Sequence, residues 1–267
     1  MLQKTTTLLL FLSVLFSSCR EDNMQVIAQL NLDEYGTEHN LIIGNALEAE
    51  IENLYTADLG ATDSTAAAYL EKMLLLVINT PDVTTREVYD YKISVIDDDS
   101  RSSSFILPNG HLYIYSGLLR FLETESQLLS LLAHEIYYAE SGAATLLIEE
   151  ASDFEKKDLG DILLDNGRAD IAGMAAAYPT LTYGESDTET ADDFSVRVLC
   201  PFVYEPRGIV KIIQKAQSPD QQMPEWFELR PAENISGRIQ RMNENAEPCG
   251  LDGVKNAAEY QAFLQRL

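Results

Sequence analysis

The stretch from Leu131 to Ser141, LLAHEIYYAES, constrains the fold of this chain most, because it places a charged pair inside an apolar helical pattern. Apolar side chains recur around it at helical spacing, at Leu128, Leu131, Leu132 and Ile136. The pattern predicts a helix that starts near Thr124 and packs one stripe against a core. His134 and Glu135 lie in the middle of this helix, so any chemistry they perform takes place beside the core.

His134 and Glu135 begin an HExxH pattern. In that pattern two histidines, four residues apart on one helix face, hold zinc, and the glutamate takes a proton from the metal-bound water. The second histidine belongs at position 138, where the sequence has Tyr138. A histidine–glutamate pair alone is a weak signal, because a histidine on an apolar helix is usually a hydrogen-bonded core residue.

Residues 1–18 have the features of a secretory signal peptide: a basic start, the apolar run LLLFLSVLF and small residues before Cys19. The run is too short to span a bilayer. The segment resembles the lipobox of bacterial lipoproteins, although Phe16 stands where leucine is usual, and this resemblance implies that Cys19 becomes the lipidated first residue. The alternative is an ordinary cleaved signal with an incidental cysteine.

These features predict a location in the bacterial cell envelope, as an outer-membrane lipoprotein that faces the periplasm or the surface. Arg20-Glu21-Asp22 resembles the export signal of surface lipoproteins in Bacteroidetes. The chain has 19 Lys and Arg against 43 Asp and Glu, without a basic patch, which argues against nucleic acid as a partner. We therefore expect membrane attachment through the lipid on Cys19 alone.

A polar tether is expected over residues 19–36, and one domain over residues 37–267. Helical periodicity or capping predicts helices over 40–55, 63–78, 124–140, 144–151, 154–164, 168–177, 189–199, 208–216, 235–243 and 254–267. Alternating residues predict strands over 91–97 and 111–115, with a turn at Pro108-Asn109-Gly110. Many helices around a few clustered strands predict an α+β fold.

Cys200 and Cys249 are the cysteines that remain beyond Cys19. In an oxidising compartment they predict one disulfide bond, and the alternative is two unpaired buried thiols. The sequence has no CxxC or Cys/His cluster that would suggest a metal site.

The segment SSFILPNGHLYIYSGLLRFLETESQLLSLLAHEIYYAE, residues 103–140, resembles the HtpX-like and CAAX-prenyl-protease-like zinc metallopeptidases. That family has a strand reading NAFALPGG, an extended edge strand, GLL and then LAHExxH. Further on, TETADDFSVRVL resembles the family's ExEAD helix, which supplies the third zinc ligand, and PEWFELRPAENISGRIQRM resembles a segment that usually contains THP. The resemblance covers residues 85–242 and implies a mainly helical zincin-like domain with a small mixed sheet.

The departures from this family fall at the metal site. His134 and Glu135, the first ligand and the catalytic base, are present, but Tyr138, Thr188 and Arg230 stand where the family has histidine, glutamate and histidine. Asp192 aligns with the aspartate of the family helix. A register shifted by one residue would instead make Glu189 the ligand, and one residue rotates a helix by about a quarter turn, so both registers cannot hold.

The resemblance therefore implies a pseudopeptidase that binds extended polypeptide without cutting it and without a cofactor. Two alternatives stay open: an active zinc metalloendopeptidase with altered ligands, and a structural envelope lipoprotein. Without zinc, Glu135 is expected to pair with Arg230 or Arg197 in place of the metal.

The resemblance also implies a peptide site. In the family the strand after the turn pairs with extended substrate, and HLYIYS, with His111, Tyr113 and Tyr115 on one face, has the alternation that such an edge strand needs. The alternative for the strand is an edge covered by a neighbouring loop. The alternative for His111 is a solvated residue of an edge strand.

Overall fold

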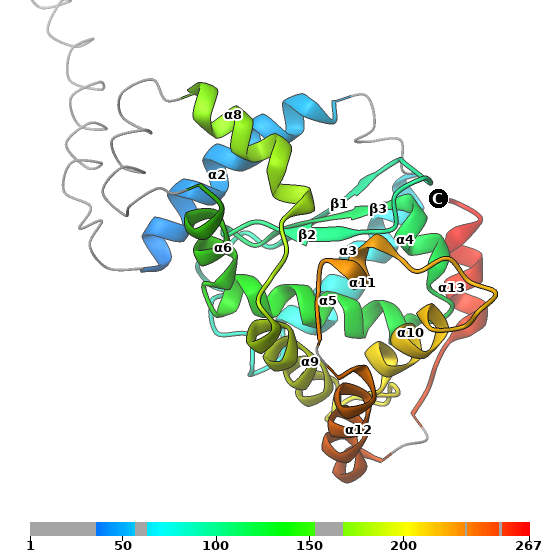
Figure 1. Ribbon diagram of the computed structural model, residues 1–267. Coiled ribbons are helices and arrows are strands. Elements are labelled where there is room, and N and C mark those ends of the chain that lie inside the picture. Colours follow the sequence, from blue (N-terminus) through cyan, green and yellow to red (C-terminus); the bar gives the residue numbers. More distant parts are fainter. Residues whose placement is uncertain (1–35, 57–62, 153–167, 233, 251–252) are drawn as a thin grey trace, which may run out of the picture.

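The computed structural model describes residues 36–56, 63–152, 168–232, 234–250 and 253–267. In these ranges helices surround one small mixed sheet, which confirms the predicted α+β class (Figure 1). The helices are α2 (Thr37–Leu54), α3 (Ser64–Ile78), α4 (Ser116–Phe121), α5 (Glu125–Glu140), α6 (Ala143–Ser152), α8 (Arg168–Ala177), α9 (Glu185–Leu199), α10 (Gly208–Ala216), α11 (Glu225–Glu228), α12 (Ile235–Ala246) and α13 (Ala257–Leu264). The predicted signal peptide with Cys19, the tether up to residue 35 and the predicted helix over 154–164 lie outside the described residues.

The sheet has three strands in the order β1-β3-β2: β1 (Lys92–Ile96), β2 (Ser104–Ile106) and β3 (His111–Tyr115). β2 and β3 form an antiparallel hairpin around the predicted turn, in which Gly110 takes a positive φ of 90°. β1 runs parallel to β3, with Lys92 opposite His111 and Ile96 opposite Tyr115.

The prediction that residues 111–115 form an open edge strand is wrong. β3 is the central strand, hydrogen-bonded to β1 on one side and to β2 on the other. His111, Tyr113 and Tyr115 are all buried, so His111 is not the solvated residue that was the alternative. Alternation does not distinguish an edge strand from a central strand whose polar side chains find partners inside the protein.

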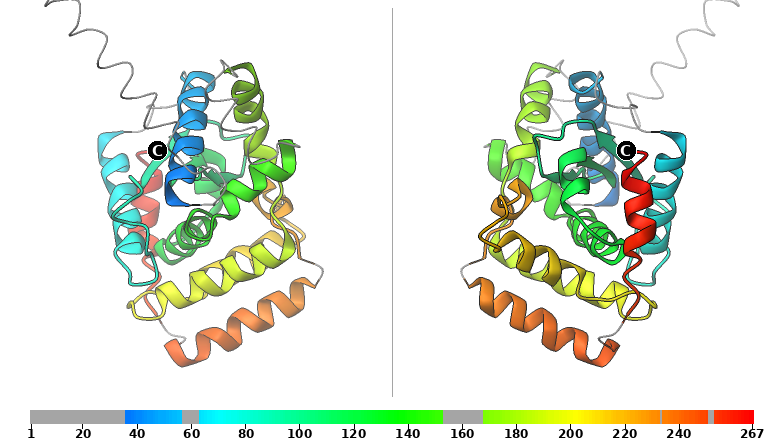
Figure 2. Two further views of the ribbon diagram at one scale, coloured as in Figure 1. Left: turned by 90° about the vertical axis from the view of Figure 1, so that its left-hand side faces the viewer. Right: turned by 90° about the vertical axis from the view of Figure 1, so that its right-hand side faces the viewer.

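Helices cover both faces of the sheet. α2 and α8 lie together on one side, and α3 and α5 lie on the other (Figure 1). α9 and α10 pack against α5, and α12 packs against both of them, so α9 and α12 form successive layers in Figure 2. α5 is therefore the central helix of the domain, between the sheet and this outer pair.

Local capping fixes where the helices beside the site begin. The side chain of Thr124 accepts a hydrogen bond from the amide of Gln127 and starts α5 where the sequence predicts it. Asp63 caps α3 by accepting from the amide of Thr65 at 2.8 Å. None of the described helices has both the length and the apolar character that crossing a membrane requires.

Candidate functional site

The candidate site lies on α5, in the interior of the protein. His134, Glu135 and Tyr138 have no exposed surface at all. α5 is enclosed by the sheet, α3, α9 and α10, so both its apolar stripe and the face that carries the histidine–glutamate pair are buried. Polar groups in such a position require partners, because an unpaired buried charge costs several kcal/mol.

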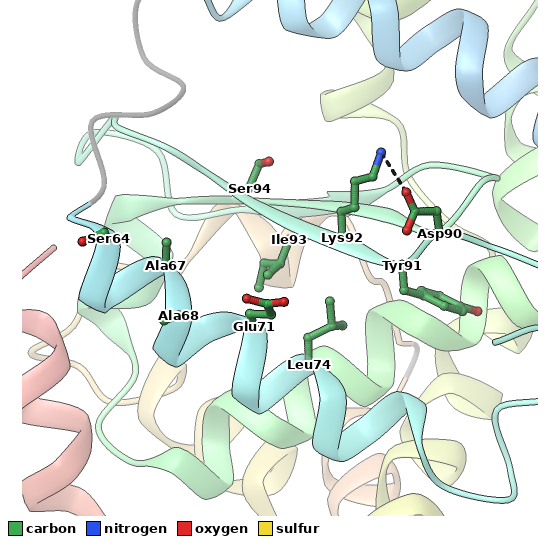
Figure 3. Close-up of a pocket in the computed structure, with 10 residues that line it drawn as sticks. All are labelled: Ser64, Ala67, Ala68, Glu71, Leu74, Asp90, Tyr91, Lys92, Ile93 and Ser94. Carbon is green, nitrogen blue, oxygen red and sulfur yellow. Dashed lines mark ion pairs between the residues drawn. The ribbon is translucent and has the colours of Figure 1, made fainter. Parts of the chain in front are cut away.

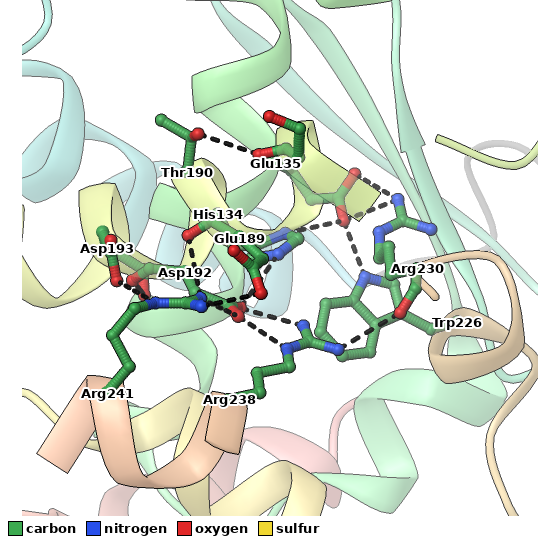
Figure 4. Close-up of polar contacts among 12 residues, drawn as sticks. His134, Glu135, Glu189, Thr190, Asp192, Asp193, Trp226, Arg230, Arg238 and Arg241 are labelled. Carbon is green, nitrogen blue, oxygen red and sulfur yellow. Dashed lines mark hydrogen bonds and ion pairs between the residues drawn. The ribbon is translucent and has the colours of Figure 1, made fainter. Parts of the chain in front are cut away.

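Glu135 is held by two donors from the segment around α11. Nη2 of Arg230 lies 2.7 Å from Oε1 and 2.8 Å from Oε2 of Glu135. The indole Nε1 of Trp226 donates to Oε1 at 2.7 Å (Figure 4). Burial by itself raises the pKa of Glu135, but Arg230, His134 and Trp226 together outweigh it and hold the pKa below its ordinary value.

Between the two possible partners named above, the structure pairs Glu135 with Arg230. Arg197 instead binds Asp82 at 2.7 Å on the surface, where the arginine side chain is 59% exposed. The guanidinium carbon of Arg230 is 5.2 Å from the centre of the Trp226 ring and 5.4 Å from that of Tyr183. This cation therefore sits among aromatic rings with a carboxylate as its ionic partner.

A second buried ion pair adjoins the first. Arg238 on α12 donates to both carboxylate oxygens of Asp192 on α9, at 2.6 and 2.9 Å. Nη1 of Arg238 also donates to the carbonyl of Arg230 at 3.1 Å, which joins the two pairs into one network (Figure 4). Burial opposes ionisation of Asp192, but His134 and Arg238 hold its pKa below the ordinary value.

His134 lies between the two carboxylates. Its Nε2 is 3.4 Å from Oδ1 of Asp192, and its Nδ1 is 3.8 Å from Oε1 of Glu135. Its ring also meets the ring of Trp226 edge to face, with centroids 5.1 Å apart. Both ring nitrogens are buried and face a carboxylate, but neither makes a hydrogen bond within the described residues.

The second family ligand position is occupied by an aromatic stack. The ring of Tyr138 lies parallel to that of Tyr183, with centroids 3.6 Å apart. Thr188, fully buried on α9, faces the phenol of Tyr138. Burial raises the pKa of Tyr138 well above its ordinary value, so the phenol is neutral at any physiological pH.

Glu189, the metal ligand expected in the shifted register, does not join His134 in a group of three possible ligands within the described residues. Its side chain is 46% exposed and binds Arg241 at 2.9 Å. Thr188, one residue earlier, is the one turned inward. Successive residues of a helix point about 100° apart, so only one of the two can face the site.

Trp226 and Tyr183 contribute to the site although no sequence motif gives either of them a role. Trp226 is the only tryptophan of the chain, and its indole donates to Glu135, a contact that no sequence pattern indicates. Tyr183 comes before α9 and has no motif of its own.

A catalytic zinc ion needs about three protein ligands and an open position for water. Here one imidazole is present, beside a neutral phenol and a neutral hydroxyl at Tyr138 and Thr188. Glu135 and Asp192 are occupied by guanidinium groups, and a buried arginine cation lies 2.7 Å from Glu135. The residues at this position therefore do not fit a zinc ion.

A different group of the described residues has ligand atoms close enough to hold a metal ion. Glu48 and Glu52 on α2 and His111 on β3 offer atoms that all lie within 4.8 Å of one another. Nδ1 of His111 is 3.1 Å from Glu48, while Nε2 is 2.9 Å from the hydroxyl of Ser94. Lys92 already pairs with Glu48 at 3.4 Å, so a cation there would compete with this lysine.

Cys200, at the C-terminal end of α9, and Cys249, after α12, are joined by a disulfide bond, with Cα atoms 4.8 Å apart. The bond links the ends of the two helices that carry Asp192 and Arg238. It therefore fixes the packing of α9 against α12 around the second ion pair.

The comparison with known families agrees with this architecture. The model of peptidase family M48 matches residues 64–246, from α3 to the end of α12, and no curated protein matches the chain. The matched region contains the sheet, the central helix and both buried ion pairs. The chain belongs to peptidase family M48, a family of zinc-dependent metallopeptidases, and has the fold of that family.

Proposed function

We propose that this protein is a pseudopeptidase of the cell envelope: a metallopeptidase fold that holds no catalytic zinc and binds extended polypeptide without cutting it. The observation that carries the proposal is the fully buried Arg230, whose guanidinium is bound to both oxygens of Glu135. A general base must reach the water that it deprotonates, and Glu135 is instead enclosed by Arg230 and Trp226.

Charge gives a second line of support. Zinc chemistry depends on a dication that lowers the pKa of bound water. Arg230 places a fixed positive charge beside Glu135, where the zinc ion of the family would lie. The guanidinium and a zinc ion would therefore repel each other. Anchoring in the envelope is the other half of the proposal and rests on the sequence around Cys19.

The decisive experiment is zinc content together with cleavage. Purified residues 20–267, dialysed against micromolar zinc, are expected to carry far less than one zinc ion per chain at His134. A His134→Ala variant should bind as much zinc as the unmodified protein, and a Glu52→Gln variant reports any zinc held by the separate group on α2 and β3. An unfolded protein substrate should be cleaved no faster than by a Glu135→Gln variant.

One outcome would favour the alternative enzyme. Stoichiometric zinc that is lost in His134→Ala, together with cleavage that is lost in Glu135→Gln, would show an active peptidase with altered ligands. A positive control shows that the assay can detect a site: Tyr138→His, Thr188→Glu and Arg230→Ala together restore two ligands beside His134 and remove the cation. This triple variant should gain zinc.

A further inference from the structure

One edge of the sheet is closed by the chain itself. On the outer side of β2, the carbonyl of Ser104 accepts from Arg230 at 3.2 Å, and that of Ile106 accepts from the hydroxyl of Tyr178 at 2.7 Å. Just before β2, the carbonyl of Ser102 accepts from the amide of Trp226 at 2.9 Å. Strand addition requires free backbone groups, so a polypeptide cannot pair with β2.

The other edge is β1, and in the described part of the chain no strand pairs with its outer side. A cavity of about 550 Å³ lies along this side, between β1 and α3. Figure 3 shows Ala67 and Glu71 of α3 and Ile93 of β1 pointing into the space between the two elements. Its α3 wall includes the short side chains of Ser64, Ala67 and Ala68, and their size leaves room for a chain to lie beside β1.

The charges of this groove select the occupant. Lys92 is its cation, and it is already paired with Asp90 at 3.2 Å and with Glu48 at 3.4 Å. Glu71 lies at the groove, and no ion pair of the described residues includes it. A basic side chain in the groove would therefore find an available carboxylate, whereas an acidic one would be repelled.

A second copy of this chain is a poorer occupant. Edge-to-edge pairing of two β1 strands would bring two acidic grooves together in molecules of net charge −24 each. A helix is also a poorer fit, since it satisfies its own backbone groups and would leave the edge of β1 unpaired.

We propose that the groove between α3 and β1 binds an extended polypeptide segment with basic side chains, which adds to β1 as a fourth strand of the sheet. The proposal rests on the proposed function for the idea that the protein binds polypeptide, and it moves the binding surface from the central strand β3 to its neighbour β1, at the edge of the sheet. β1 is five residues long, so the pairing covers about five residues of the partner.

The test uses the full chain, purified in detergent, and a fluorescein-labelled decapeptide of alternating valine and lysine. Fluorescence anisotropy should show saturable binding, and the valine–glutamate peptide should bind at least tenfold more weakly. Two further versions of the valine–lysine peptide carry N-methyl groups on alternate residues. In one version the methyl groups lie on the first edge of the extended peptide, and in the other version they lie on the second edge. Strand addition uses one edge of the peptide, so one pattern should abolish binding and the other should be tolerated.

Two groove variants and one control locate the site. Ala67→Trp fills the groove and Glu71→Lys reverses its charge, and both change exposed residues, so the fold is retained. Each should weaken binding at least tenfold. Glu244→Lys makes the same charge change at an exposed position of α12 and should leave affinity within twofold. In the complex, amide hydrogen exchange should slow in residues 92–96.

Several results would overturn the proposal. They are an absence of binding, equal effects of Glu71→Lys and Glu244→Lys, or equal tolerance of both N-methyl patterns. A dimer in sedimentation that Ala67→Trp abolishes would assign the groove to a second copy. If neither groove variant weakened peptide binding, this site would be rejected and the proposed function would stand. If the protein showed zinc-dependent cleavage, the pseudopeptidase proposal would be rejected and the result for the groove would stay valid.

Discussion

Nη2 of Arg230 lies 2.7 Å from a carboxylate oxygen of Glu135, and both side chains are within 1% of complete burial. A buried ion pair adds little net stability compared with well-packed apolar residues, but removal of one partner strands the other charge. Trp226 and the link through Arg238 hold this pair in one geometry. The site of a metal-dependent fold is thus stabilised here by the chain's own cation.

A double-mutant cycle should reveal this dependence. Glu135→Gln and Arg230→Met are each expected to lower the free energy of unfolding by about 3–5 kcal/mol, because each leaves a buried charge unpaired. The double variant should cost clearly less than the sum. Urea denaturation measures all three. The surface pair Arg197–Asp82 gives the control, and Arg197→Ala should cost no more than about 1 kcal/mol. If Arg197→Ala and Arg230→Met lowered the free energy of unfolding equally, the buried pair would not have the role assigned to it.

The two buried ion pairs, Glu135–Arg230 and Asp192–Arg238, predict a loss of stability in acid. The pKa values of Glu135 and Asp192 in the folded protein lie below their ordinary values of 4.5 and 3.8. A lowered pKa means that the stabilisation is complete above the ordinary value and is lost as the pH falls through the folded-state pKa. Urea titrations from pH 7 to pH 3 should show stability falling below about pH 4.5, with a steeper slope than in the Glu135→Gln/Arg230→Met double variant. Equal slopes would exclude Glu135 as a contributor.

Replacing Gly208 or Gly173, two helical glycines, with alanine should change the stability of the protein in opposite directions. A Cβ atom on Gly208 would lie 2.1 Å from the Ser130 hydroxyl and 2.3 Å from the carbonyl of Ser126, so α10 would have to move away from α5. Gly208→Ala should therefore cost about 1–3 kcal/mol. Gly173 of α8 has nothing within 4 Å of that position, and Gly173→Ala should stabilise by about 0.5–1 kcal/mol. Thermal unfolding distinguishes the two, and a stabilised Gly208→Ala would refute the close packing.

The disulfide should contribute through the unfolded chain. Its two cysteines are 49 residues apart, and closing a loop of that size stabilises by about 4 kcal/mol in the chain-entropy model. The Cys200→Ser/Cys249→Ser variant should lose up to this amount in urea denaturation, and its m-value should rise because the unfolded chain without the cross-link exposes more surface. Labelling of thiols in denatured, unreduced residues 20–267 should find neither cysteine, and two reactive thiols would disprove the bond.

Local features of the sequence were sufficient for several parts of the fold. The caps at Asp63 and Thr124 start their helices by hydrogen bonds two or three residues away, and the turn before Gly110 depends on one residue that accepts a positive φ. Such interactions involve neighbours in the chain, so the pattern of residue types is enough to predict them.

The sequence by itself determined the family, the α+β class and the identity of the residues at the degenerate ligand positions. Only the tertiary structure decided that Glu135 pairs with Arg230 and not Arg197, because the partners are 95 positions apart and many other arginines were available. Only the fold placed β3 between two strands and left β1 at the edge, since alternation along one strand carries no information about its neighbours. The orientation of Thr188 inward and Glu189 outward was likewise decided by the packing of α9 on α5, which fixes the rotation of a helix that its own sequence leaves open.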